Sequence, residues 1–223
     1  MKAAFPVAIN SDKATYDIQF GNVERPTHWN TSWDLAKFEV CAHKWADLSE
    51  GGYGVALLND CKYGYDIKDS VLRLSLLKSA IHPNPDADKE LHEFTYSLYP
   101  HSGNFKEAKV DQMAYRLNCP VYCVLQEAHT GTLPEEISFI SVDQSNVFID
   151  TIKKSESGKE YIVRMYENHN RLTESCCTFY QEICSVVECD LLENDISEVC
   201  HQGNQFEFLM KPFEIKTFKI VMK

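Results

Sequence analysis

The sequence has no long hydrophobic run. No stretch of its 223 residues approaches the roughly 18 consecutive apolar side chains that a membrane-spanning helix needs. The short apolar run after Met1 meets the polar residues 10–13 too soon to form the core of a secretory signal peptide. We therefore expect a cytoplasmic protein without a membrane partner.

Basic residues are also few. Lysine and arginine together number 22 against 33 acidic residues, which gives a formal net charge of −11. A field of this sign repels phosphate backbones, and no cluster of basic residues is dense enough to overcome it. The composition therefore excludes nucleic acid as a general partner.

Motifs of the common catalytic and metal sites are missing as well. The sequence has no G-x-S-x-G elbow, no Walker loop and no H-E-x-x-H helix. Its nine cysteines are odd in number and irregularly spaced, which predicts reduced thiols. Cys119 and Cys123 have no second Cys or His pair at zinc-site spacing, and the eight histidines are scattered. We predict no catalytic residue, metal ligand or cofactor site in this chain.

Alternation of apolar and polar residues is the dominant pattern, and it predicts many short β-strands. One segment has helical spacing instead, and it predicts a helix over 106–117 with Asn104 as its cap and Cys119-Pro120 as its end. The predicted strands lie near residues 14–20, 38–42, 53–58, 71–76, 92–98, 121–125, 137–140, 147–149, 161–166, 184–189, 206–210 and 213–222.

This pattern of many strands and one short helix predicts an all-β fold with β-sandwich packing. A loop rich in Gly, Thr, Pro and Glu near residues 130–136 is the best candidate boundary between two β units. We accordingly predict a large β-sandwich domain over residues 1–132. A smaller C-terminal β-sandwich unit over residues 133–223 is expected to pack on it.

The first candidate functional segment is residues 22–34, which read as a long polar loop with two tryptophans. The faces of Trp29 and Trp33 can stack on sugar rings, and the neighbouring Arg, Asn and Asp suit hydroxyl recognition. Alternatively, the tryptophans anchor the loop on a neighbouring domain, and the ordinary behaviour of such loops favours this second interpretation.

The second candidate segment is residues 58–66, between two predicted strands. Its dense hydrogen-bonding groups and its tyrosines suit a carbohydrate subsite, and we predict substrate binding by Asn59, Asp60, Lys62, Tyr63 and Tyr65. Asn-Asp and Tyr-Gly are also ordinary turn formers, so a plain turn stays an open alternative.

These segments carry a family resemblance. The run GGYGVALLNDCKYGYDI at residues 51–67, within a similar stretch over 20–67, resembles the C-terminal region of family 38 glycoside hydrolases, the α-mannosidases. Residues 72–101, 162–167 and the run PFEIKTFKIVMK at 212–223 resemble the same region in the same order. The resemblance is greatest to the cytosolic and bacterial branch. It implies a sandwich of the supersandwich, galactose-mutarotase-like type.

The resemblance also implies that the catalytic residues and the metal ion of the family belong to a domain outside this chain. Members of the family have an N-terminal catalytic domain with an aspartate nucleophile and a divalent, zinc-type ion, and that domain would be the partner of this chain in the same polypeptide. Mannose-containing oligosaccharides would be the substrate, hydrolysed with retention. Whether the chain counts as an enzyme is therefore uncertain: the parent protein would be an α-mannosidase, whereas this chain alone is predicted to be inactive. The resemblance leaves open a homo-oligomer of the full-length enzyme.

Three functions follow as hypotheses. The first is a non-catalytic region that supports a mannosidase catalytic domain and contributes a loop to substrate contact. The second is an independent carbohydrate-binding module, which would bind sugar without the rest of the enzyme. The third is a stand-alone enzyme with an unfamiliar site, which the missing nucleophile and base disfavour.

Overall fold

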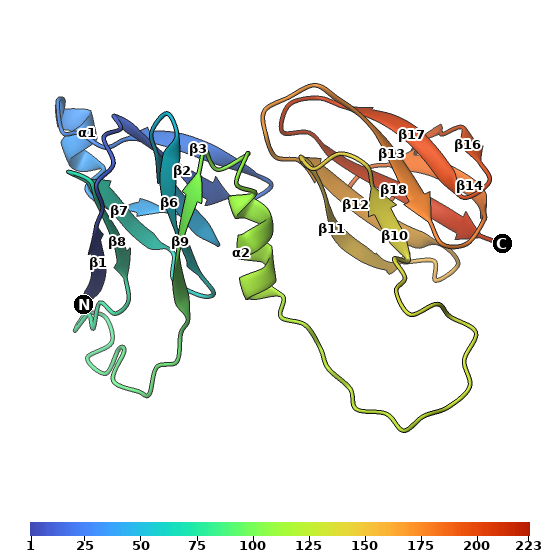
Figure 1. Cartoon of the computed structure of the whole chain (residues 1–223), viewed down its shortest axis with the longest axis horizontal. Helices are drawn as coiled ribbons and strands as arrows, with labels where there is room; N and C mark the ends of the chain where they lie inside the picture. The colour runs from blue at the N-terminus through green and yellow to red at the C-terminus, as the bar shows by residue number, and fades with distance from the viewer. The chain divides into compact units, whose positions relative to one another are not determined.

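The computed structural model describes residues 1–223 and contains eighteen strands and two helices (Figure 1). The chain divides into two compact units, Met1–Val124 and Leu125–Lys223. Both units are built from pairs of antiparallel sheets, so the predicted all-β sandwich fold is confirmed. The boundary predicted after residue 132 falls a few residues beyond the division, in the same stretch of chain without strands. Neither helix has the length and apolar character that would let it cross a membrane.

The first unit consists of a four-stranded and a five-stranded sheet. In spatial order, the four-stranded sheet contains β1 (Lys2–Pro6), β8 (Val71–Ser75), β7 (Gly64–Lys68) and β4 (Val40–Cys41). The five-stranded sheet contains β3 (Gly21–Pro26), β2 (Lys13–Ile18), β5 (Trp45–Ser49), β6 (Tyr53–Asn59) and β9 (Tyr96–Ser102).

Both faces of the five-stranded sheet are covered near its centre. The main core includes Leu57, Leu72 and Leu74, while a second cluster includes Trp45 and Leu58. Because β6 contributes to both clusters, it is buried on both faces, and its sequence is almost continuously apolar. The outer cover is the helix α2 (Val110–Asn118), which packs on β5 and β6.

The helix α2 begins later than the sequence predicts. Asn104 does not cap it, because its side-chain oxygen accepts hydrogen bonds from the backbone N–H groups of Lys106 and Glu107 in a preceding turn. Lys109, with a left-handed φ of 53°, then stands at the N-cap. The helix ends at Asn118, immediately before Cys119-Pro120, so the predicted end is confirmed.

The prediction of a single helix is wrong. A second helix, α1 (Ser32–Ala36), lies in the stretch that was predicted to be an irregular loop. Thr31 and Asp34 form its capping box, in which each side chain accepts a hydrogen bond from the backbone N–H of the other, at 3.2 and 3.1 Å. The start of the same stretch is also regular, because residues 22–26 belong to β3.

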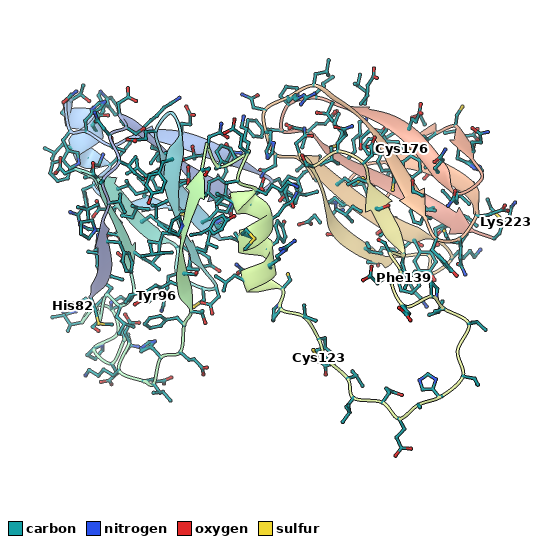
Figure 2. All side chains as sticks on the ribbon, in the orientation of Figure 1. His82, Tyr96, Cys123, Phe139, Cys176 and Lys223 are labelled. Atoms are coloured by element: carbon teal, nitrogen blue, oxygen red, sulfur yellow. The ribbon has the colours of Figure 1, made fainter.

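The strand predicted over residues 121–125 is absent. Val121, Tyr122 and Leu125 are 88%, 92% and 101% exposed, in an extended segment between α2 and β10 on which Cys123 is labelled (Figure 2). A strand needs a neighbouring strand to pair its backbone N–H and C=O groups, and none lies beside this segment. Apolar alternation alone therefore misled the prediction.

The second unit also has two sheets. The smaller one contains β10 (Ile140–Val142), β13 (Thr173–Phe179), β17 (Gln205–Met210) and β16 (His201–Gln202). The larger one contains β11 (Val147–Lys154), β12 (Tyr161–Glu167), β18 (Ile215–Met222), β14 (Ile183–Cys189) and β15 (Asp195–Glu198). The strand β18 pairs with β12 on one side and with β14 on the other, so the strand predicted over residues 213–222 is confirmed from Ile215 to Met222.

Aromatic rings fill the core of the second unit, and a buried carboxylate fastens its loops. The rings of Phe206 and Phe218 lie 4.9 Å apart between the sheets. Glu167 is fully buried and accepts hydrogen bonds from the Asn146 side chain at 2.8 Å and from the backbone N–H of Phe213 at 3.0 Å. One side chain thereby joins the ends of three segments that are distant in sequence.

Candidate functional site

The two segments singled out in the sequence lie at opposite ends of the first sandwich. The strand β7 connects these ends, because Gly64 pairs with Ser75 at one of them and Lys68 with Val71 at the other. We call the end that carries residues 59–63 the amide end, after the buried amide of Asn59. We call the end that carries residues 10–12, 27–30 and 68–70 the lysine end, after the buried ammonium of Lys68.

Asn59 organises the amide end from inside. Its side chain is buried, and its Nδ2 donates a hydrogen bond to the His43 carbonyl at 2.8 Å and another to the Tyr65 hydroxyl. Its Oδ1 accepts from the backbone N–H groups of Cys61 at 3.0 Å and Lys62 at 2.5 Å. The amide therefore uses both its donors and its acceptor to fix the loop that follows β6.

Tyr65 lies below the same loop with none of its surface exposed. Its ring packs edge-on against Tyr16 at 6.4 Å between centroids. Burial raises the pKa of Tyr65 well above its ordinary value, so the hydroxyl stays protonated. Both Asn59 and Tyr65 thus have their polar atoms engaged inside the protein, and a bound sugar would meet them only through the loop that they hold.

Asp60 is exposed and fastens the loop to the segment before β9. Its two carboxylate oxygens each lie 3.0 Å from the backbone N–H of Thr95, and the Asp60 N–H donates to the Thr95 carbonyl at 3.2 Å. Partial burial alone would raise the pKa of Asp60, but the hydrogen bonds from Thr95 outweigh it and lower that pKa below its ordinary value. The carboxylate is therefore ionised at neutral pH, with acceptor sites left for a ligand.

Lys62 and Tyr63 complete the outer surface of the amide end. The Lys62 ammonium lies 4.8 Å from the centroid of the Phe94 ring. Tyr63 is 56% exposed, and its ring meets His43 edge-on at 5.4 Å. The five predicted residues thus lie in or beside one loop, with Asn59 and Tyr65 on the strands that flank it, and they have two different structural roles. Asp60, Lys62 and Tyr63 are accessible, whereas Asn59 and Tyr65 are internal supports.

The lysine end is built around a residue that the sequence reasoning missed. Lys68 is only 6% exposed, and its Nζ donates to the carbonyls of Pro26 at 2.9 Å and His28 at 3.2 Å. Burial lowers the pKa of Lys68, while Asp34 and other nearby carboxylates oppose that effect. The one local signal in the sequence is a lysine at the end of a half-apolar strand, directly before an Asp-Ser turn, and this signal was not used.

A buried ion pair lies on the five-stranded sheet near the lysine end. The Nε2 of His101 is 2.7 Å from the Oδ1 of Asp47, and the Ser49 hydroxyl donates to the other carboxylate oxygen. The Ser49 hydroxyl therefore donates to the Asp47 carboxylate and not to His101, so the three side chains are not in the Ser–His–Asp order of a catalytic triad. Gly54 makes room for the cluster, since a Cβ there would lie 2.4 Å from the His101 ring.

The histidine, cysteine and acidic side chains do not assemble a metal centre. No group of three or more of them lies close enough together to hold an ion.

Comparison with known proteins identifies the family. The family model described as "Glycosyl hydrolases family 38 C-terminal domain" matches residues 1–86. A second, "Glycosyl hydrolases family 38 C-terminal beta sandwich domain", matches residues 146–218. The chain is 40% identical to "Alpha-mannosidase 2C1" of Homo sapiens over 228 residues, which covers 100% of this chain and 22% of the relative. The chain belongs to glycosyl hydrolase family 38, as part of its C-terminal region.

Further matches agree with this family 38 assignment. The chain is 42% identical to "Alpha-mannosidase G" of Dictyostelium discoideum over 225 residues, with 96% of this chain and 20% of the relative covered. The crystal structure of an alpha-mannosidase from Enterococcus faecalis V583 superposes with a TM-score of 0.79 at 16% identity, over 98% of this chain and 25% of that one. At that identity, the superposition shows the shared fold alone.

The matched stretches place both ends of the first sandwich within the family 38 C-terminal domain, because residues 59–63, 27–30 and 68–70 all fall within 1–86. The helix α2 and the extended segment after it lie outside both matched stretches. The chain spans about a fifth of the length of the curated relatives it matches.

Proposed function

We propose that this chain is the non-catalytic C-terminal region of a cytoplasmic glycoside hydrolase that cleaves α-mannosidic bonds. The similar proteins that carry the name alpha-mannosidase support the proposal, since each is several times longer than the stretch it shares with this chain. The longer polypeptide would supply the catalytic domain, and this region would support it. Mannose-containing oligosaccharides are the proposed substrate.

The observation that carries a role in substrate contact is the construction of the amide end. Asn59 and Tyr65 fix the loop from below, while Asp60, Lys62 and Tyr63 remain accessible on its surface. A rigid loop with an anionic acceptor, a cationic donor and an aromatic hydroxyl can hydrogen-bond sugar hydroxyls without a large ordering cost. We propose that these three residues contact substrate and that Asn59 and Tyr65 are positioning residues.

The chemistry itself would belong to the preceding catalytic domain. Retaining hydrolysis needs two carboxyl groups about 5 Å apart, one as nucleophile and one as acid and base. The accessible carboxylate of Asp60 is bound to the Thr95 backbone, and its lowered pKa makes it a poor proton donor at neutral pH. Asp60 would therefore act by binding a sugar hydroxyl, as an ionised acceptor.

The test is a substitution in the longer polypeptide that carries this region. Asp60→Asn and, separately, Tyr63→Phe should each lower kcat/KM for a mannoside about tenfold, the effect of one lost hydrogen bond to substrate. The matched control is Asp86→Asn, at an exposed turn whose carboxylate pairs only with the exposed Lys89. Unchanged kcat/KM in both test variants would contradict the proposed contact.

A second measurement tests the non-catalytic assignment. The 223-residue chain alone should not hydrolyse an aryl α-mannoside. Hydrolysis that co-purifies with the chain and disappears on substitution of one of its own carboxylates would refute the assignment.

A further inference from the structure

The lysine end carries an open hollow on its surface. Its volume is about 490 Å³, and residues 10–12, 27–30 and 68–70 line it. This volume is within the range of small-ligand sites, about 300–1,000 Å³. The hollow lies at the opposite end of the first sandwich from the loop 59–63, so it is separate from the proposed substrate contact.

Hydrogen bonds between the three lining segments preform the hollow. The backbone N–H of Thr27 donates to the Asp12 carbonyl at 3.0 Å, and its hydroxyl donates to the Ser11 carbonyl at 2.6 Å. The Ser70 hydroxyl donates to the Ile9 carbonyl at 2.6 Å. Because the walls are fastened to one another, a ligand would not have to order them on binding.

Trp29 supplies an aromatic surface at this hollow. The residue is 51% exposed, although a tryptophan of a folded domain is generally well buried. The Lys68 ammonium lies 6.0 Å from the centroid of the Trp29 ring. It donates to two carbonyls, and an ammonium has three N–H donors, so one donor is left for a ligand acceptor beside the ring.

The charges of the lining residues restrict the class of ligand. Asp12 and Asp69 contribute two negative charges against the single positive charge of Lys68, which disfavours phosphate, sulfate and other anions. The side chains do not form a group that could hold a metal ion. What fits an aromatic face, a few polar groups and a slightly negative field is an uncharged, polyhydroxylated ring.

We propose that the hollow at the lysine end is a binding site for a neutral hexose ring of an oligosaccharide, which stacks on Trp29 and accepts a hydrogen bond from Lys68. The proposal rests on the hollow and its lining and does not depend on the hydrolase assignment. A single hexose has few atoms with which to contact the protein, so the expected dissociation constant is about 1 mM.

The test uses the three tryptophans as separate reporters in the 223-residue chain. Their indole N–H resonances are followed by NMR during titration with methyl α-D-mannopyranoside and, in a parallel sample, with inorganic phosphate. Trp29 lines the hollow, Trp33 is 78% exposed on α1 outside it, and Trp45 is 1% exposed in the core. The sugar should shift the Trp29 resonance saturably and leave the other two unmoved.

Two variants make the result specific. Trp29→Ala should weaken binding about tenfold, as measured on backbone resonances of the lining residues, with an unmoved Trp45 resonance showing that the fold is retained. Trp33→Ala is the matched control and should bind as the unsubstituted chain does. No saturable shift of Trp29, equal shifts of Trp29 and Trp33, or a stronger response to phosphate would each overturn the proposal. Loss of mannosidase activity in an Asp60 variant would leave this outcome unaffected.

Discussion

Each end of the first sandwich is held by one buried polar side chain. The two side chains differ in how many of their hydrogen-bonding groups have a partner within the protein. At the amide end, the neutral amide of Asn59 makes four hydrogen bonds within the protein. At the lysine end, the charged ammonium of Lys68 donates to two carbonyls and keeps one donor. The amide of Asn59 therefore serves the fold, whereas the third N–H donor of Lys68 is the group that the proposed hexose would use.

The substitution expected to lower the stability of the first unit most is at the amide end. Asn59→Ala leaves the backbone N–H groups of Cys61 and Lys62 without their acceptor and takes from the Tyr65 hydroxyl its nearest partner. We therefore expect the free energy of unfolding of the first unit to fall by about 3 kcal/mol. All three tryptophans lie in this unit, so their fluorescence in a urea titration reports its unfolding separately from the second unit.

The control for that experiment is Asn84→Ala, in an exposed turn where the side chain accepts only from the Asp86 N–H at 3.0 Å. Its effect should stay within about 0.5 kcal/mol. An Asn59 variant as stable as the control would remove the contrast between the two ends.

Removing the charge of Lys68 should lower the free energy of unfolding of the first unit by a smaller amount. Lys68→Met leaves the carbonyls of Pro26 and His28 without a donor but also eliminates the cost of a buried charge, so we expect a loss of about 1–2 kcal/mol. The matched control is Lys62→Met at the amide end, where the ammonium lies over the Phe94 ring. The same urea titration measures both. A loss at Lys68 that exceeded the loss at Asn59 would reverse the comparison.

The smallest expected effect is the change in stability of the first unit with pH that the His101–Asp47 pair causes. Burial alone would lower the pKa of His101, but the hydrogen bond and charge of Asp47 outweigh burial and raise it above the ordinary value of 6.5. The folded state therefore holds this proton more tightly than the unfolded state. The pair contributes its full stability below pH 6.5 and loses it as pH rises through the raised pKa.

We therefore expect the urea midpoint of the first unit to fall as the pH rises above 6.5, and His101→Gln to flatten that dependence. The difference between the unsubstituted chain and the variant isolates the histidine from the other titrating groups. A difference that does not change with pH would show that the pair does not titrate in this range.

The sequence predicted a strand correctly where a segment of apolar and polar alternation also has a neighbouring strand to pair with. The strand β6 reads as buried on both faces because α2 covers its outer side, and the helical spacing of α2 was visible in the sequence. Residues 121–125 have the same apolar character but no strand beside them, and pairing across a sheet is a long-range property that a local pattern does not contain. The helix α1 was missed because five residues are too few for a periodic signal, and only its capping box marks it.

The sequence predicted the position of the candidate site around one loop. It did not predict which of the five residues are buried supports and which are accessible to a ligand. Asn59 and Tyr65 were chosen for their polar groups, as were Asp60 and Lys62. The local sequence does not distinguish a polar side chain that is buried in the fold from one that is exposed to solvent. Lys68 was missed for the converse reason. Its carbonyl partners at Pro26 and His28 lie about forty residues away, and folding alone brings them together.

The position of β18 has a consequence for biosynthesis. It follows every other strand of the second unit along the chain, yet it lies between β12 and β14 in the middle of the larger sheet. Until a ribosome has released this segment, the edges of β12 and β14 that pair with it in the folded unit have no partner strand. Unpaired strand edges invite association with other chains. The second unit should therefore depend on chaperone protection late in its translation, and a premature stop before Ile215 should yield an insoluble product.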